Sequence, residues 1–302
     1  MKRHWVLILS GWLLAGNAFG QDALPFTRID RNPVTSAFAG AGAAYSGTAA
    51  YGAFGNAAML PFFGRTLEAA VSYQRWSPGL ALSNNVSAGV AYKLTPQIGL
   101  ALGYSLGSGA SYDVYEGPGE PSGVFYPKNH VIAFGVGVGI TEQLSLGANI
   151  RYARDVPSPA QVIGGVSADL FAAFQPMESL RFTAGLSTLG TRVAETWKQP
   201  ASLKAAVDWG LSLEEVHALN LMADADYYFS GHFSAAAGFQ YAFRQLLFVR
   251  AGLRLAPEDC VIPAHLALGL GFHYHGIGLD LSFLTASQTL ANTLNIGLQY
   301  SF

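Results

Sequence analysis

The residues best suited to chemistry in this 302-residue sequence are three histidines near its C-terminal end, His265, His273 and His275. They share the odd-numbered positions of one segment. Neighbours two apart on a β-strand lie about 7 Å apart, so a metal pair is geometrically conceivable. A metal site or a nucleophile–base pair would need an acidic or thiol partner. No such side chain is arranged near these histidines in the sequence. We therefore favour structural or interior-lining histidines and keep a metal site as the alternative.

Charged residues on neighbouring segments form a second group that could act together. They are Asp208, Asp224, Asp226, Arg250 and Arg254. We expect the three carboxylates to face the two guanidinium groups and to brace the interior as charge pairs. The single cysteine, Cys260, is expected to be an unreactive thiol in a loop beside Asp259.

Motifs for nucleotide or cofactor chemistry are not found in the sequence. The stretch Gly135–Gly139 alternates glycine with valine as a strand does, and so is not a phosphate loop. The 17 Lys and Arg nearly balance the 19 Asp and Glu, which removes the basic face that nucleic acid requires. We expect a protein that is not an enzyme, that uses no cofactor or metal, and that does not bind nucleic acid.

The composition points to a membrane protein. Only 12% of the residues are charged and 51% are hydrophobic, whereas an average soluble domain is about 25% charged. A spanning helix needs about 18 or more consecutive apolar residues, and none is found after residue 20. The apolar surface must therefore be presented to lipid by something other than helices.

Alternation with a period of two runs through the sequence from about residue 66. In the segment 98–106, Ile98, Leu100 and Leu102 fall on one face, while Gly99 and Ala101 fall on the other. Successive side chains of a strand point to opposite sides, so one face is apolar and the other is small or polar. A soluble β-sandwich is the alternative, but its second face carries many charges, and here the second face is mainly Gly, Ala, Ser and Asn.

Fourteen segments of this kind can be counted, most of them long enough to cross a bilayer as tilted strands. Their spans are 66–76, 84–94, 97–107, 129–140, 143–153, 161–174, 179–189, 201–212, 217–228, 232–243, 245–255, 264–275, 276–284 and 292–302. Longer connections, such as Ser108–Lys128 and Arg154–Ala160, often follow odd-numbered segments, and short ones follow even-numbered segments. We predict an all-β fold, an antiparallel transmembrane β-barrel of about 14 strands over residues 65–302, with outer-membrane lipid around it.

Residues 1–20 have the pattern of a signal peptide. A basic start precedes the apolar core Trp5–Gly16, and Ala18-Phe19-Gly20 supplies small residues for cleavage. We therefore expect Sec-type export to the outer membrane of a Gram-negative bacterium. The final segment alternates up to Phe302, which is similar to the signal read by the outer-membrane assembly machinery.

Residues 21–64 do not alternate, and we expect them to form an N-terminal periplasmic or lumenal plug segment. The stretch 35–63 is rich in Gly and Ala and nearly uncharged, so it could pack closely in a confined space. A flexible periplasmic tail is the alternative.

Parts of this N-terminal segment resemble the opening of PorV/PorQ proteins, which belong to the FadL-like group of fourteen-stranded barrels. The similar stretches are Phe26–Ile29, Ala37–Ala44 and Tyr51–Leu60. The sequence departs from the group's pattern where Ala57 replaces a proline and where Gly47–Ala50 replaces an acidic element. The resemblance makes the motif residues the candidates for a plug or hatch. They are Phe38, Gly40, Gly42, Asn56 and Leu60.

The resemblance implies two possible functions. PorV/PorQ proteins are accessory barrels of type IX secretion in Bacteroidota, and they dock to a large translocon or to cargo-processing proteins. FadL-like transporters instead pass hydrophobic small molecules across the outer membrane, and they commonly carry large outer loops. Because the longest loop here is only about Ser108–Lys128, we expect the accessory role and keep passive transport as the alternative.

Overall fold

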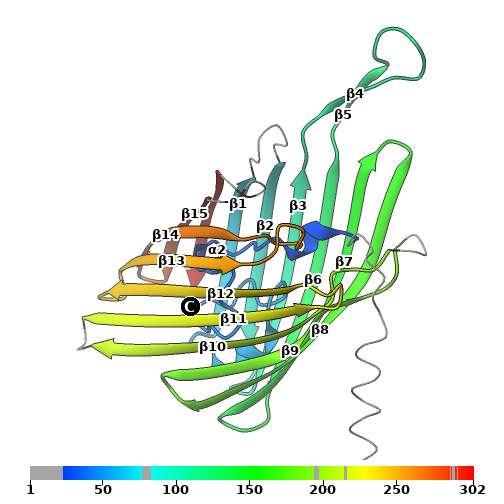
Figure 1. Cartoon of the computed structure of the whole chain (residues 1–302). Coiled ribbons are helices and arrows are strands. Elements are labelled where there is room, and N and C mark those ends of the chain that lie inside the picture. The colour runs from blue at the N-terminus through cyan, green and yellow to red at the C-terminus, as the bar shows by residue number, and fades with distance from the viewer. Residues whose placement is uncertain are drawn as a thin grey trace, which may run out of the picture.

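The computed structural model describes residues 23–76, 83–193, 197–213, 216–285, 287, 290 and 292–302. The predicted signal peptide, residues 1–20, lies outside the described residues. The described chain forms a closed antiparallel barrel of fourteen strands (Figure 1), which confirms the predicted fold class. In these ranges, no helix has the length and apolar character needed to cross a membrane.

Each barrel strand pairs with its two neighbours, and the first strand pairs with the last to close the ring. The barrel strands are β1 (Leu67–Trp76), β2 (Ser83–Lys93), β3 (Ile98–Ser108), β6 (Lys128–Gly139), β7 (Leu144–Ser158), β8 (Gln161–Met177), β9 (Leu180–Gly190), β10 (Ser202–Leu213), β11 (His217–Tyr228), β12 (Phe233–Phe243), β13 (Leu247–Leu255), β14 (His265–Tyr274), β15 (Ile277–Thr285) and β16 (Thr293–Ser301). A closed ladder leaves no strand edge with unpaired backbone groups, which is what allows strands to span a bilayer.

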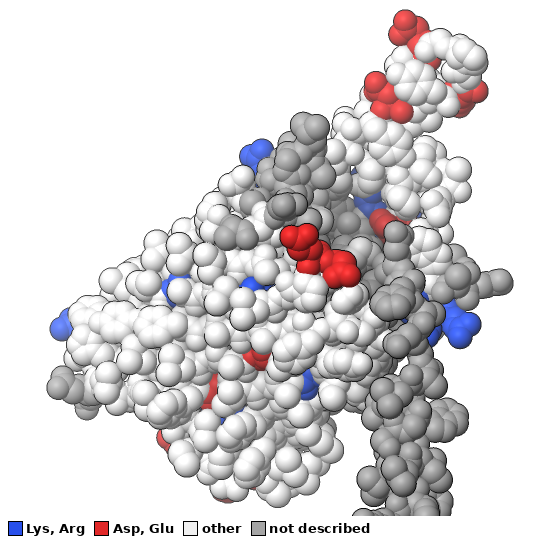
Figure 2. All heavy atoms as spheres, viewed as in Figure 1, with Lys and Arg blue, Asp and Glu red and all other residues white. Residues whose placement is uncertain are grey.

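The two faces of each strand differ in the way the alternation predicts. On β14, Ala267 is 1% exposed and faces the interior, whereas the adjacent Leu268 is 57% exposed on the outside. Figure 2 shows that the visible barrel exterior carries few charged side chains. An apolar exterior on a closed barrel is the form in which β-proteins meet lipid, so the exterior is the lipid-facing surface.

The connection between β7 and β8 differs from the sequence prediction. A loop was expected at Arg154–Ala160, but β7 continues to Ser158 and β8 begins at Gln161. The ladder continues through the pairs Asp155–Ile163 and Ser158–Gln161, with an irregularity between them. Outside the bilayer, backbone pairing needs no apolar face. The two strands can therefore extend beyond the residues in which apolar and polar side chains alternate.

The N-terminal segment, residues 23–63, lies inside the barrel (Figure 1). Its short helices are η1 (Pro25–Arg28), α2 (Pro33–Ala37) and η2 (Ala57–Phe62). The α2 helix packs on β13–β16, and η2 packs on β2, β3 and β6–β8. The Ala23 amide donates to the Lys198 carbonyl in the β9–β10 connection, at the end of the barrel with the longer loops. The segment thus crosses the interior from that end to the start of β1.

Asparagine residues start both helices that pack on the wall. Asn32 accepts the Val34 amide at 3.0 Å ahead of α2, and Asn56 accepts the Ala58 amide at 2.9 Å ahead of η2. Such side-chain acceptors satisfy amides that a helix leaves without partners at its first turn. The chain turns away after α2 at Gly40, whose φ of +81° favours glycine.

Glycines on the inner face of the wall make room for the N-terminal segment. A Cβ atom at Gly89 on β2 would overlap the Ala50 carbonyl. A Cβ atom at Gly147 on β7 would overlap the Ala58 amide nitrogen. The wall and the segment are therefore in direct backbone contact, which larger side chains at these positions would prevent.

The β4–β5 hairpin (Tyr112–Val114 and Gly123–Phe125) projects beyond the barrel from the β3–β6 connection (Figure 1). Its two strands pair only with each other. Tyr112 donates from its hydroxyl to the Pro157 carbonyl at the end of β7, at 2.9 Å. Acidic side chains gather on this projection (Figure 2).

Candidate functional site in the barrel lumen

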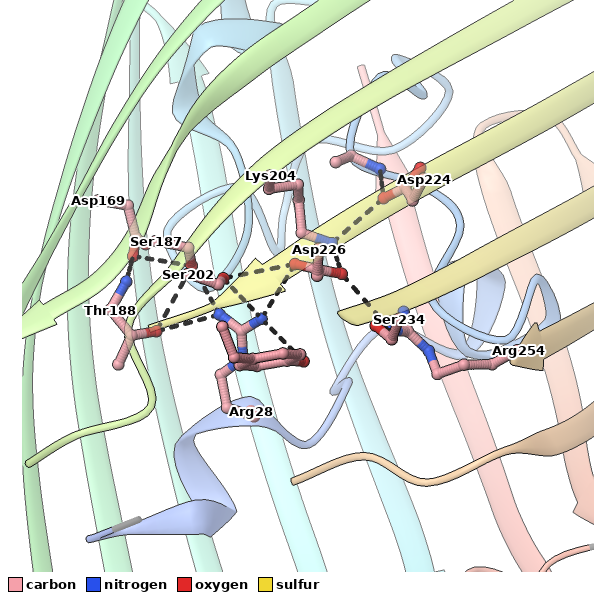
Figure 3. Close-up of polar contacts among 12 residues, drawn as sticks. Arg28, Asp169, Ser187, Thr188, Ser202, Lys204, Asp224, Asp226, Ser234 and Arg254 are labelled. Atoms are coloured by element: carbon pink, nitrogen blue, oxygen red, sulfur yellow. Dashed lines mark hydrogen bonds and ion pairs between the residues drawn. The ribbon is translucent and has the colours of Figure 1, made fainter. Parts of the chain in front are cut away.

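Asp226 is the centre of an ion network between the N-terminal segment and the wall (Figure 3). Its carboxylate accepts from Lys204 on β10 at 3.0 Å and from Arg28 of the N-terminal segment at 3.3 Å. Arg254 on β13 donates to the same carboxylate at 3.5 Å. Asp226 is 1% exposed, so these three cations balance its charge in place of water.

Arg28 joins η1 to several wall strands. One terminal nitrogen donates to the hydroxyls of Ser187 and Thr188 at 2.8 and 3.2 Å, and the other donates to the Tyr228 hydroxyl at 3.3 Å. Its guanidinium carbon lies 5.1 Å from the centroid of the Tyr228 ring. A guanidinium has five N–H donors in a fixed fork, so one side chain can hold the segment against β9 and β11 at once.

The structure brings two of the five predicted pairing residues together, Asp226 and Arg254. Asp224 instead lies 3.3 Å from Lys204, and it also accepts the Ala43 amide of the N-terminal segment at 3.2 Å. Lys204 lies opposite Asp226 in the β10–β11 register and reaches both carboxylates. Cross-strand register, rather than charge sign alone, therefore decides these partners.

The other two predicted residues have partners that sequence reasoning missed. Asp208 accepts from Arg181, directly opposite on β9, at 3.0 Å. Arg250 donates to Asp280 at 2.5 Å although the two lie on β13 and β15 with β14 between them. The intervening strand carries Gly271, where a Cβ atom would meet both side chains. The signal available in the sequence was the inner-face position of Arg181 and Asp280.

The candidate residues of the predicted plug contact the wall or shape the segment. Phe38 is fully buried, with its ring edge-on to Tyr45 at 5.4 Å between centroids. A Cβ atom at Gly40 would meet the Arg254 guanidinium, and one at Gly42 would overlap the side chain of Thr35. These glycines allow the chain to turn closely beneath the wall.

The last two candidates lie at the η2 end of the segment. The Asn56 amide donates to the Ala43 carbonyl and to the Thr183 hydroxyl on β9, each at 2.9 Å. Leu60 is 4% exposed, and its backbone and Cβ atom lie where a side chain at Gly99 of β3 would stand. Asn56 and Leu60 thus fix the end of the segment against β9 and β3 of the wall.

Two of the cavities among the described residues lie between the N-terminal segment and the wall. The first, of about 180 Å³, is lined by charged residues that include Arg28, Arg31 and Asp226. The second, of about 70 Å³, shares the charged residues Arg28, Asp30 and Arg254 with the first, and most of its remaining lining is apolar. Its apolar lining includes Ile29, Trp76, Ile262, Leu284 and Leu290. The interior therefore offers a polar space and an apolar space side by side.

Two of the three histidines have separate hydrogen-bond partners. His265 places Nδ1 2.9 Å from the Pro263 carbonyl oxygen, and His273 places Nε2 3.0 Å from the Asp280 carboxylate. His275 lies in the β14–β15 turn with a φ of +48°. In the described part of the chain, no group of three or more His, Cys, Asp or Glu side chains is placed to hold a metal ion.

Cys260 is buried in the β13–β14 connection. Burial raises the pKa of its thiol, which disfavours the reactive thiolate.

No protein-family model and no curated protein matches the sequence. Solved structures do match the fold. The toluene transporter TbuX of Ralstonia pickettii aligns with a TM-score of 0.62 at 12% identity, covering 90% of this chain and 98% of that one. A Pseudomonas aeruginosa FadL homologue aligns with a TM-score of 0.56 at 10% identity, covering 94% of this chain and 100% of that one. The Pseudomonas putida toluene transporter TodX aligns with a TM-score of 0.59 at 14% identity, covering 90% of this chain and 98% of that one. The chain therefore has a FadL-like barrel fold.

Proposed function

We propose that this protein is a passive transporter of hydrophobic small molecules across the outer membrane of a Gram-negative bacterium. The observation that carries the proposal is the alignment with the toluene transporter TbuX over 90% of this chain. The shared fold extends over 90% of this chain and 98% of TbuX, and is not confined to a few strands. Transport by such a barrel needs no chemical step, which agrees with the expectation that the protein is not an enzyme.

The apolar cavity of about 70 Å³ is the place where we expect a hydrophobic solute to bind. It lies toward the end of the barrel with longer loops, because Trp76 ends β1 and Leu284 lies next to the end of β15. Concave, mostly apolar spaces with a few polar groups are typical of small-molecule sites. Ile262, from the β13–β14 connection, lines it as well.

The N-terminal segment is proposed to act as the plug of this passage. It is held by wall side chains that bind its backbone. Examples are Glu68, which accepts the Ala49 and Ala50 amides at 2.8 Å each, and Arg254, which donates to the Ala39 carbonyl at 3.0 Å. A segment fixed at points around the wall leaves only narrow spaces beside it, and these spaces limit the size of the solute.

The accessory role in type IX secretion, which the PorV/PorQ resemblance implied, is less well supported. The resemblance covers short stretches of the N-terminal segment, whereas the transporters align over most of the chain. Residence in Bacteroidota and Sec-type export by residues 1–20 remain proposals. Purification from native membranes tests the accessory role, since a stoichiometric translocon or cargo-processing protein would then come with the barrel.

Uptake of labelled toluene by cells producing the protein tests transport. We expect uptake well above that of cells without it, and a change in uptake when residues 35–60 are deleted. The matched control replaces residues 110–126 of the projecting hairpin with an Asn-Gly turn, which leaves the lumen intact. Uptake equal to that of empty cells, from a barrel shown to be folded by its gel mobility, contradicts the proposal.

A further inference from the structure

Two buried arginines meet beside Phe54 in the lumen. Arg31 comes from the N-terminal segment, and its guanidinium carbon lies 4.9 Å from the centroid of the Phe54 ring. Arg151 comes from β7 and donates to the Phe54 carbonyl oxygen at 3.3 Å. Arg31 is 6% exposed and Arg151 is 3% exposed. Like charges that are so poorly hydrated repel each other strongly, so their proximity calls for a compensating anion.

The two arginines differ in how they are compensated. Arg151 forms an ion pair with Asp169 of β8. Arg31 has no ion pair within the described residues, and it donates to backbone carbonyls at the end of η1. These carbonyls belong to Phe26, Thr27 and Ile29. The Nε atom of each arginine is buried without a hydrogen-bond partner. Burial, and after it the charge of Arg151, lower the pKa of Arg31.

Both arginines line the cavity of about 180 Å³, together with three further cations, Arg28, Lys204 and Arg254. Four carboxylates stand against these five cations. They are Asp30 and Asp226 in the lining and Asp169 and Asp224 bonded to its residues. Asp30 already accepts the Thr35 hydroxyl at 2.9 Å and the Asn32 amide at 3.0 Å. The protein groups around this cavity therefore leave one positive charge unbalanced.

We propose that this cavity binds a small oxyanion of the carboxylate or phosphate class, held between Arg31 and Arg151. Guanidinium groups bind such oxygens with paired, charge-assisted hydrogen bonds, and the free Nε atoms supply donors for them. The cavity has room for a ligand of several non-hydrogen atoms. The anion bridges the N-terminal segment to β7 and so adds to the contacts that hold the segment. The proposal does not depend on the transport function, because the anion can come from solution or be the acid group of a solute.

Isothermal titration of the purified full-length protein in detergent, at constant ionic strength, tests the site with three probes. These are inorganic phosphate, benzoate, and benzyl alcohol as the neutral match for benzoate. Binding of phosphate alone supports a site for free anions, and binding of benzoate as well supports a solute that carries an acid group. Binding of neither anion, or binding of benzyl alcohol as tightly as benzoate, overturns the proposal.

Variants then locate the site. We expect Arg31→Gln to weaken anion binding by about tenfold or more, because a charge-assisted partner is lost. Arg31→Lys keeps the charge and should retain most of the affinity, and Arg192→Gln, at an exposed loop position, is the matched control. Unchanged affinity in a folded Arg31→Gln protein overturns the assignment. If that variant does not fold, the titration of the natural protein still decides. Toluene uptake, measured separately, reports on the proposed function alone.

Discussion

A single buried carboxylate, Asp226, is shared by three cations that come from separate parts of the chain. Arg28 belongs to the N-terminal segment, Lys204 to β10 and Arg254 to β13. Removing one member of a buried ion cluster costs more than the cluster itself contributes, because the remaining charges lose their compensation without regaining water. The stability of the interior should therefore be sensitive to this one residue.

Asp226→Asn is expected to destabilise the protein by about 3–5 kcal/mol, since one buried and two part-buried cations then share no carboxylate at this position. Samples are heated to a series of temperatures before electrophoresis. The temperature at which the folded band disappears should be clearly lower for the variant than for the natural protein. Asp259→Asn is the control, because the Asp259 side chain is 75% exposed in its pair with His232. Equal midpoints for the Asp226 variant and the natural protein would show that the network contributes little.

Gly147→Ala is expected to strain the contact between β7 and η2, at a cost of about 1–3 kcal/mol. The added Cβ atom would overlap the Ala58 amide nitrogen, so η2 must move away from the wall. Protease access to the N-terminal segment should rise while the barrel stays folded. Gly123→Ala in β5, where nothing lies within 4 Å of the added atom, should behave as the natural protein does. Identical protease patterns for both variants count against close contact.

Among the elements, the β4–β5 hairpin and the N-terminal segment differ in how much of the barrel wall they contact. The hairpin pairs with itself and projects from the barrel, whereas the segment packs on strands around the wall. Gly109 and Pro127 are already joined by a backbone hydrogen bond of 3.0 Å at the base of the hairpin. The chain can therefore be shortened there without reaching the barrel.

Replacing residues 110–126 with an Asn-Gly turn should leave thermal stability within about 1 kcal/mol of the natural protein, since few contacts are lost. The midpoint of heat-dependent gel mobility is again the measurement. Deleting residues 35–60 instead removes the interior packing, and it should raise single-channel conductance in planar bilayers. A large loss of stability on removing the hairpin would mean that it supports the rim of the barrel.

For the whole molecule, the closed ladder of fourteen strands determines behaviour in detergent. Every barrel strand is hydrogen-bonded on both sides, so unfolding has no free edge at which to begin. Unheated samples in SDS are expected to migrate faster than boiled ones, and the protein should require detergent to stay in solution. A single band position at all temperatures would contradict a stable closed barrel.

Much of the fold could be predicted because lipid imposes a simple rule on each strand separately. The alternation in residues 98–106 marks β3 without knowledge of any other segment. The same rule could not find the end of β7, since Asp155–Ser158 pair outside the apolar band. The five charged side chains predicted to pair are buried inside the barrel. Their partners depend on register, as in the opposition of Asp208 to Arg181, and register is not visible in one strand alone.

By itself, the sequence determined that this is a fourteen-stranded barrel with an apolar exterior. In each strand, residues two apart face the same side, so apolar residues mark the side that faces lipid and small or polar residues mark the side that faces the interior. Only the tertiary structure decided why the inner face of the wall has small residues. Positions 89 and 147 are glycine rather than a larger residue because the backbone of the N-terminal segment lies against them. Likewise, Arg31 and Arg151 are 120 residues apart in sequence and meet only when that segment enters the closed barrel, since contacts between distant parts of a chain leave no local pattern.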